Sequence, residues 1–387
     1  MKLRTITAAP LKKGMRVLIR VDFNVVVHKG KILDDFRMRE ALPTIQFLLR
    51  RGCRVRILAH LGRPGGKKVK SLSLVPLARH LARLLKRRVT FIPDPFSMRV
   101  HERFGTSRDV LFFENLRFWS GEEKDNASFA RGLSRWGDLY INEAFSDSHR
   151  AHASITSLAR LLPSCAGYRL AAEVKFLGKA LARPRHPFLV ILGGAKVSTK
   201  LPLIRRFLRI ADRIIIAGAM ANTIFVLRGL EVGKSAVERS LLKSIPHPLF
   251  TNKKLLYPGD VIVVDSRGGH RRLRQKPVTR ILPSDFIGDI GSRSLSLFIR
   301  QAKRARTIIW NGPLGYVDER RFQEGTLTFA RALSRMHSFR IAGGGETAAV
   351  IHKAGLIKKF SHVSTGGGAM LEFLMGKRLP GVEVLEK

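Results

Sequence analysis

The feature that most constrains the fold is the repeated pairing of a short apolar run with a helical segment. The runs are rich in β-branched and aromatic residues and are too uniformly apolar to alternate between a buried and an exposed face. A helical stretch with regularly spaced leucines, such as residues 74–87, follows or separates them. This pattern predicts an α/β fold with doubly wound, Rossmann-like sheets. The predicted parallel strands lie in residues 16–25, 54–62, 110–118, 139–145, 188–194, 213–220, 261–266, 307–315 and 339–345.

The pattern breaks near the middle of the chain. A long stretch without strand character follows residue 145, then a helical segment at 170–182 and a segment rich in proline and charge at 182–188. The 387 residues also exceed one domain of about 150 residues. We therefore expect a bilobal molecule, with domains at 1–170 and 185–375 joined by a hinge helix and linker at 171–184.

Polar side chains gather where the predicted strands of the first half end. Parallel sheets bind ligands beyond the carboxyl ends of their strands. Arginines there lie in polar islands between apolar runs, and guanidinium groups bind carboxylate and phosphate through two hydrogen bonds. A ring of these residues could hold a small molecule that carries both groups. Its members are Asp22, Asn24, Arg37, His60, Arg63, Arg117 and Arg150.

Glycine-rich segments follow the strands of the second half. The sequence GGGETA at 343–348 fits a dinucleotide site, a helix start that needs close backbone approach, or a phosphate cradle. A dinucleotide site, and hence a nicotinamide-dependent dehydrogenase, also needs an acidic residue about 20 positions later, and none is present. A second glycine triplet at 366–368 favours anion binding. The sequence GLEVGKS at 229–235 has three residues between its glycines instead of four, so it is not a P-loop.

Net charge is the most unusual feature of the composition. Lys and Arg number 71 against 29 Asp and Glu, which gives a formal charge of +42. Such an excess favours anionic ligands but does not choose among nucleic acid, phosphate metabolites and anionic lipid. The basic residues are scattered and not interleaved with aromatic residues, so we expect no dedicated nucleic-acid partner, only non-specific polyanion binding at low salt.

Two features bear on location. The two cysteines, Cys53 and Cys165, cannot build a disulfide framework and fit a reducing compartment. The first residues lack the apolar stretch of a signal peptide, and no apolar run approaches the roughly 20 residues that span a bilayer. We therefore expect a cytoplasmic protein without a membrane partner.

Taken in order, the motifs resemble the phosphoglycerate kinase family along essentially the whole chain. The matching segments are RVDFNV, HLGRPGG, ENLRF, HRAHAS, LGGAKVSTK, WNGPLG, GGGET and STGGGA. The resemblance implies reversible phosphoryl transfer from 1,3-bisphosphoglycerate to ADP, giving 3-phosphoglycerate and ATP, with Mg²⁺ as cofactor. It also implies a monomer whose first domain binds the three-carbon substrate and takes in the C-terminal tail 376–387, and whose second domain binds the nucleotide.

The resemblance further implies roles for individual positions. Arg37, Lys196, Gly345 and Gly367 would be catalytic, and Glu346 would lie near the metal. Substrate-binding positions would be Asp22, Phe23, Asn24, Arg37, His60, Leu61, Gly62, Arg63, Arg117 and Arg150. Nucleotide-binding positions would be Gly194, Ala195, Lys196, Lys200, Gly218, Asn311, Pro313, Asp318, Gly344, Gly345, Glu346 and Thr347.

Two positions depart from the family pattern. The family usually has Asp where this chain has Glu346, and Glu where it has Asp318. Each carboxylate is kept on an arm that differs by one methylene, so a shifted nucleotide KM is expected before a lost activity. The alternative function is a polyanion or nucleic-acid-binding protein that keeps the kinase fold.

Overall fold

The computed structural model describes residues 2–242, 247–265 and 272–386. Two compact units make up the chain. Unit 1 contains Met1–Lys175 and Gly376–Lys387, and unit 2 contains Phe176–Met375. The helix α7 (Tyr168–Ala182) begins in unit 1 and ends in unit 2. Each unit has its own sheet and its own core, so each is described separately.

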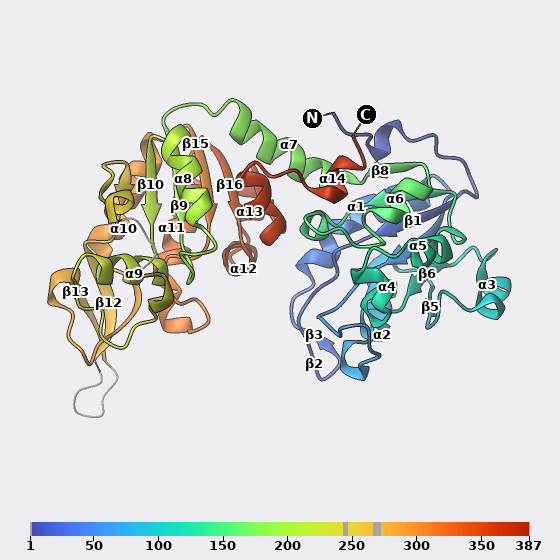
Figure 1. The fold of residues 1–387 in the computed structure, drawn as a ribbon, viewed down its shortest axis with the longest axis horizontal. Helices are drawn as coiled ribbons and strands as arrows, with labels where there is room; N and C mark the ends of the chain where they lie inside the picture. The colour runs from blue at the N-terminus through green and yellow to red at the C-terminus, as the bar shows by residue number, and fades with distance from the viewer. Residues whose placement is uncertain (1, 243–246, 266–271, 387) are drawn as a thin grey trace. The chain divides into compact units, whose positions relative to one another are not determined.

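Unit 1 is built on a six-stranded parallel sheet in the order β5-β6-β4-β1-β7-β8 (Figure 1). Its strands are β1 (Arg16–Arg20), β4 (Arg54–Leu58), β5 (Val89–Ile92), β6 (Val110–Phe113), β7 (Leu139–Asn142) and β8 (Ser164–Ala166). Alternate residues of β1 enter different cores. Val17 and Ile19 pack with α1 (Phe36–Arg50) and α2 (Val75–Leu85), whereas Leu18 packs with α5 (Ala127–Ser134) and α6 (Ser157–Leu161). Helices therefore cover both faces of the sheet.

Shorter elements complete unit 1. They are α3 (Met98–Phe104), α4 (Ser120–Glu123), α14 (Pro380–Glu383) and a hairpin of β2 (Val27–His28) and β3 (Lys31–Ile32). The two chain ends lie side by side (Figure 1), because the amide of Arg4 donates to the carbonyl of Leu385 at 2.9 Å. The amide of Asn142, at the end of β7, also donates through Nδ2 to the carbonyl of Gly381 at 3.1 Å. These bonds tie the C-terminal segment to the sheet of unit 1.

Unit 2 repeats the architecture with the strand order β11-β10-β9-β15-β16-β17, again parallel. Its strands are β9 (Phe188–Leu192), β10 (Arg213–Ile216), β11 (Leu255–Leu256), β15 (Thr307–Asn311), β16 (Phe339–Gly343) and β17 (His362–Ser364). Its helices are α8 (Leu201–Ile210), α9 (Ala219–Leu227), α10 (Ser292–Arg304), α11 (Glu324–Ser334), α12 (Gly345–Lys353) and α13 (Gly368–Leu374). Apolar residues of α10, α11 and α12 form one core with the sheet. The predicted class, two doubly wound parallel-sheet domains, is confirmed.

A parallel strand was predicted at 261–266, and this prediction was wrong about the direction of pairing. This run forms β12 (Asp260–Asp265), which lies in a separate antiparallel sheet between β13 (Arg272–Pro277) and β14 (Phe286–Ile290). Residue 266 lies outside the described residues. An apolar run signals burial but not the direction of the neighbouring strand, and the two-residue β11 takes the edge of the parallel sheet instead. The strand β8 also lies in the stretch after residue 145 where no strand was expected.

Candidate active site

In unit 1, the carboxyl ends of neighbouring strands bring several predicted residues together. The amide of Gly62, which follows β4, donates to Oδ1 of Asn24, which follows β1, at 3.0 Å. Arg117, which follows β6, donates through Nη1 to the carbonyl of Gly62 at 2.9 Å. Because β6, β4 and β1 are adjacent parallel strands, the loops that follow them meet at one edge of the sheet. Three segments far apart in sequence thus form one polar surface.

Asp22 and Arg37 form an ion pair within this surface. Asp22 also accepts a hydrogen bond through Oδ1 from the amide of Asn24 at 3.2 Å. Arg37 lies in the first turn of α1, and its side chain remains 27% exposed while that of Asp22 is 9% exposed. The pair therefore holds a partly exposed guanidinium beside a nearly buried carboxylate.

A buried network of charges lies beneath the strand ends, with Asp147 at its centre. Asp147 accepts hydrogen bonds from Arg20 Nη2 at 3.1 Å and from Arg117 Nη2 at 3.2 Å, and His60 Nδ1 lies 3.2 Å from its Oδ2. Burial opposes ionisation of Asp147, yet the facing cations, Arg20 and Arg117 among them, hold its pKa well below the usual range. Burial lowers the pKa of His60 well below its ordinary value, so its imidazole is neutral at neutral pH.

The other substrate positions divide into core and surface residues. The rings of Phe23 and Phe112 stack at 6.0 Å, and Leu61 belongs to the same core, so only the backbones of Phe23 and Leu61 can face a ligand. Arg63 is exposed. Arg150 donates through Nε to Nε2 of His149 at 3.2 Å. The surface thus contains Asp22, Asn24, Arg37, His60, Gly62 and Arg117, while no contact links Arg63 to it among the described residues.

The charge of Arg150 nevertheless reaches the buried network. Burial lowers the pKa of the Arg117 guanidinium, and the positive charges of Arg20 and Arg150 lower it further, against the opposing effect of Asp147. The cations Arg20 and Arg117 and the neutral His60 therefore meet at the buried Asp147, and Glu123 Oε1 is a second acidic group, 3.6 Å from Arg117 Nε. A site of this composition has unsatisfied capacity for an anion.

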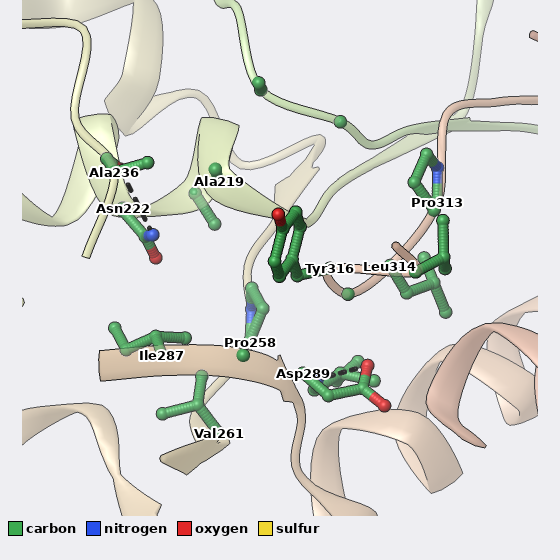
Figure 2. A pocket seen from close by; sticks show the side chains of 18 of the residues that line it. Ala219, Asn222, Ala236, Pro258, Val261, Ile287, Asp289, Pro313, Leu314 and Tyr316 are labelled. Carbon is green, nitrogen blue, oxygen red and sulfur yellow. Dashed lines mark hydrogen bonds between the residues drawn. The ribbon is translucent and has the colours of Figure 1, made fainter. Parts of the chain in front are cut away.

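Unit 2 contains a cavity of about 470 Å³, a size that suits a nucleotide base and sugar. Turns after β9, β10 and β15 form one side and β14 forms another (Figure 2). Asn222 from α9 and Tyr316 from the loop after β15 point toward it (Figure 2). The predicted positions that line the cavity are Gly194, Ala195, Gly218, Pro313, Asp318 and Glu346. Ala219, Phe225, Pro258, Ile287 and Asp289 are among the lining residues that were not predicted.

A close approach of backbones at the cavity edge requires glycine. A Cβ on Gly193 would lie 2.0 Å from the carbonyl oxygen of Pro313, and one on Gly312 would lie 2.3 Å from that of Gly193. Lys200 inserts its ammonium group here and donates to the carbonyl of Gly193. Burial lowers the pKa of Lys200 to about 8, while the negative charge of Glu346 opposes the shift. Lys200 is therefore a buried cation beside a glycine turn.

The start of α12 supplies the remaining polar groups on this side. Gly344 precedes the helix with φ +96°, a conformation that favours glycine, and open space surrounds the Cα of Gly345. Desolvation raises the pKa of the Glu346 carboxyl, and the like charge of Asp318 raises it further. The hydroxyl of Thr347 is buried and has no hydrogen-bond partner in the described structure. A ligand bound here would supply the hydrogen-bond partners that these groups lack.

Seven predicted nucleotide or catalytic positions of unit 2 lie outside the cavity lining: Lys196, Lys200, Asn311, Gly344, Gly345, Thr347 and Gly367. Asn311 is buried, with Nδ2 3.8 Å from the sulfur of Met370. Lys196 is exposed. Burial raises the pKa of Glu238, but hydrogen bonds from Ser198 and Val197 and the charge of Lys196 together lower it below its usual value. Gly367 precedes α13 with φ +50° and open space around it. Within the described ranges, no group of three or more His, Cys, Asp or Glu side chains is placed to hold a metal ion.

Some site residues were not predicted from the sequence. Asp147 lies in the polar segment SDSHRAHAS. Arg20 lies inside an apolar run, and an arginine in such a run indicates a buried charge that needs an acidic partner. Asn222 and Tyr316 come from a helix and a loop without a strand-end signal. These four residues were found only through the tertiary structure.

The chain has two parallel-sheet units. One has a cationic surface at its strand ends, and the other has a nucleoside-sized cavity beside a glycine turn. Together these features define the class of protein as a kinase. Sequence comparison specifies the family: the model of the phosphoglycerate kinase family matches residues 9–377, and the chain belongs to that family. The chain is 41% identical over 392 residues to the phosphoglycerate kinase of Coprothermobacter proteolyticus, covering 100% of this chain and 99% of that protein. It is 43% identical over 378 residues to that of Rubrobacter xylanophilus, covering 96% of each.

Solved structures agree with this assignment. The structure of phosphoglycerate kinase from Coxiella burnetii matches with a TM-score of 0.83 and 35% identity, covering 99% of this chain and 98% of that chain. The enzyme from Pyrococcus horikoshii matches with a TM-score of 0.89 and 30% identity over the same shares. The predicted resemblance is confirmed, and nothing in these comparisons supports the alternative of a polyanion-binding protein. Among the described helices, none is long and apolar enough to cross a membrane.

Proposed function

We propose that this chain catalyses reversible phosphoryl transfer between 1,3-bisphosphoglycerate and ADP, giving 3-phosphoglycerate and ATP. The observation that carries the proposal is the polar surface of unit 1, where Asn24, Gly62 and Arg117 are joined by hydrogen bonds beside the Asp22–Arg37 pair. A three-carbon acid phosphate carries one carboxylate and one phosphate, and guanidinium groups bind both. The fully buried Asp147 orients Arg117 toward this surface.

On the substrate side, we assign binding to Asp22, Asn24, Arg37, His60, Gly62, Arg63, Arg117 and Arg150, with the backbones of Phe23 and Leu61. His60 is neutral, so it suits a hydroxyl or phosphate oxygen as a hydrogen-bond donor or acceptor. The exposed Arg63 has no competing partner among the described residues, which leaves its guanidinium available for substrate. Unit 1, which includes residues 1–170 and 376–387, would then be the substrate domain.

On the nucleotide side, the cavity of about 470 Å³ would take the adenosine. Gly194, Ala195, Gly218 and Pro313 would contact the base, and Asp318 would reach the ribose hydroxyls. Asn311 would belong to the adenosine side of the site, whereas Lys196 and Lys200 would face the phosphates, together with the backbone of Gly344 and Gly345. The free amides at the start of α12 support this arrangement, because the first turn of a helix favours anions. Residues 185–375 would form the nucleotide domain.

The residues present fit a magnesium ion bound with the nucleotide. Two carboxylates, Glu346 and Asp318, are close enough to raise the pKa of Glu346, and the unpartnered hydroxyl of Thr347 is a further oxygen. Mg²⁺ is held by one or two carboxylates plus substrate phosphates in sites of this kind, where it neutralises phosphate charge. We assign Glu346 to its surroundings.

The chemistry asks little of the protein beyond positioning and charge. In the direction of ATP use, the acceptor is a carboxylate that is already ionised at neutral pH, so no general base is required. We assign Arg37 and Lys196 to the charge that develops on the transferring group, and the amides near Gly345 and Gly367 to its oxygens. Because each substrate would bind its own unit, residues 171–184 would act as a hinge that lets the two meet.

Two further properties belong to this proposal. Both cysteines are free and buried, which fits a cytoplasmic location. We also expect a monomer, because each unit holds its own set of binding groups. Neither property affects the assignment of the reaction.

The test is a coupled assay that follows consumption of ATP and 3-phosphoglycerate by the purified protein over a series of magnesium concentrations. The proposal expects turnover that needs all three components. Phosphorylation of glycerate lacking the phosphate group at the same rate, or turnover that is unchanged without magnesium, would contradict it.

A further inference from the structure

Unit 2 has a second large cavity, at the opposite end of its sheet from the nucleotide site. The first residues of β15 and β16, Thr307 and Phe339, line this groove, whereas the last residues of the same strands, Asn311 and Gly343, lie on the nucleotide side. Its volume is about 1160 Å³. The groove therefore shares no lining residue with the nucleotide cavity.

Positive charge dominates the groove. Seven of its lining side chains are exposed cations: Lys179, Arg183, Arg185, Lys303, Arg304, Arg306 and Arg335. No Asp or Glu is among its lining residues in the described chain. None of the seven side chains forms a hydrogen bond or an ion pair with any other described residue. Gathering like charges without counter-charges destabilises a folded protein unless an anion neutralises them.

Helix dipoles account for only part of this cluster. Lys179 lies in the last turn of α7 and Lys303 and Arg304 in the last turn of α10, where the partial negative charge of a helix end favours cations. Arg183 and Arg335 directly follow α7 and α11 and benefit in the same way. Arg185 and Arg306 lie beyond the helix ends, so no helix dipole explains them. In the same groove the hydroxyl of Ser338 is buried without a hydrogen-bond partner among the described residues. A donor without a partner is a second sign that a ligand belongs here.

The number and spacing of cations favour a chain of phosphates over a single anion. One phosphate is satisfied by one to three basic groups, whereas here seven line a groove of about 1160 Å³. The floor offers no free phenyl or indole ring for stacking a base, and the one other ring among its described lining residues is the imidazole of His337. Phe339 packs on Phe176 with ring centroids 6.1 Å apart, and the ammonium of Lys179 lies 4.9 Å from its centre. Single-stranded nucleic acid is usually bound through such stacking.

We propose that this groove binds a linear inorganic polyphosphate chain through its phosphates, independently of the kinase reaction. The arginines would pair with successive phosphates, and Ser338 would donate to one of them. The apolar side chains of Ile299 and Met336 line the groove between the charges. This assigns a ligand to part of the net charge of +42 that the reaction itself does not need.

The test measures binding of a short-chain inorganic polyphosphate to the full-length protein by titration calorimetry at several salt concentrations. The test variant carries Arg304→Glu, Arg306→Glu and Arg335→Glu. The control carries Arg272→Glu, Arg280→Glu and Arg293→Glu, which are exposed arginines of unit 2 outside the groove, so both variants change the charge equally. We expect the test variant to lose at least about tenfold in affinity and about two to three units of salt slope, and the control to lose much less.

Kinase turnover and thermal unfolding of both variants are measured alongside. Turnover within about twofold of the starting protein shows that the test variant is folded, since none of its three residues lies in the nucleotide cavity. Equal losses in the test and control variants would overturn the proposal, as would undiminished binding by the test variant. An oligodeoxynucleotide with the same number of phosphates is the last arm. The proposal is overturned if it binds more tightly than polyphosphate, and supported if it binds equally or less tightly.

Discussion

Asp147 accepts a hydrogen bond from Arg117 at 3.2 Å between Oδ1 and Nη2, and both side chains are almost completely buried. Arg117 also donates to the carbonyl of Gly62 at 2.9 Å, so the carboxylate positions the guanidinium that holds the loop after β4. The substrate surface of unit 1 therefore depends on Asp147, an acid that is too deeply buried to contact the substrate itself.

Removing the charge of this acid should destabilise unit 1. We expect Asp147→Asn to lower the free energy of unfolding by about 3–5 kcal/mol, because Arg20 and Arg117 would be left buried without a counter-charge. Urea unfolding measures the change. The matched control is Asp138→Asn, which breaks an exposed pair with Arg16 and should cost at most about 1 kcal/mol. Equal effects of the two substitutions would refute the role given to Asp147.

Arg37 should matter for catalysis far more than for folding. Arg37→Ala is expected to lower kcat by about 100-fold, the scale of losing one charge-stabilising donor, while the unfolding free energy changes much less. Arg39→Ala serves as the control, because Arg39 lies in the same helix and pairs with Asp35 at 2.8 Å on an exposed face. Steady-state kinetics of both variants decide the matter. Turnover of Arg37→Ala close to that of the starting protein would remove Arg37 from the mechanism.

The affinity for nucleotide should fall as pH rises through about 8. The pKa of Lys200 is lowered to about 8 by burial, so its ammonium group loses its proton in this range and no longer attracts phosphate. The KM for ATP, measured from pH 7 to 9, should rise in the starting protein but stay nearly flat in Lys200→Met. The same dependence in both proteins would show that another group titrates.

The stability of the folded protein should respond to Lys200 in the opposite direction. Above pH 8 the unfolded chain still binds a proton at this lysine, whose ordinary pKa is 10.5, whereas the folded protein does not. Lys200 therefore lowers the free energy of unfolding by its full amount below about pH 8, and this penalty shrinks between about pH 8 and 10.5 and is absent above that window. Comparing Lys200→Met with the starting protein by urea unfolding at pH 7 and pH 9 isolates this contribution. From pH 7 to pH 9 the starting protein should gain unfolding free energy relative to Lys200→Met. A starting protein that loses unfolding free energy relative to the variant over this range would contradict the assigned pKa.

Glu346 should set the magnesium requirement. We expect Glu346→Gln to raise the magnesium concentration needed for half-maximal turnover by about tenfold, because the carboxylate that we assign to the magnesium site is lost. Glu346→Asp keeps the charge and places the residue type that the family usually has, so it should change this value much less. A glutamine variant with an unchanged magnesium dependence would show that Glu346 does not serve the metal.

The sequence predicted those parts of the fold that burial alone determines. The runs at β1, β4, β6, β7, β9, β10, β15 and β16 are apolar because both of their faces are covered, and each became a parallel strand. Strands of two or three residues, such as β11 and β17, carry too few residues for such a signal. The run at β12 is equally apolar but pairs antiparallel, since burial does not report the direction of a neighbouring strand.

For the candidate site, the sequence could indicate residues that lie together where they follow a strand end, while their roles stay a prediction. Asn24, Gly62 and Arg117 were predicted and are joined by hydrogen bonds. Asp147 was not predicted, because its partners Arg20 and Arg117 are 127 and 30 residues away and no local pattern marks such a pairing. Long-range ion pairs of this kind become visible only when the tertiary structure is known.

The central claim is that substrate and nucleotide bind to different units. Hydrogen exchange of the full-length protein, measured by mass spectrometry with 3-phosphoglycerate alone and with ADP and magnesium alone, tests it most directly. The account predicts that 3-phosphoglycerate slows exchange in residues 22–37 and 60–63, and that ADP slows it in residues 194–200 and 344–347. Protection of the same unit by both ligands would contradict it.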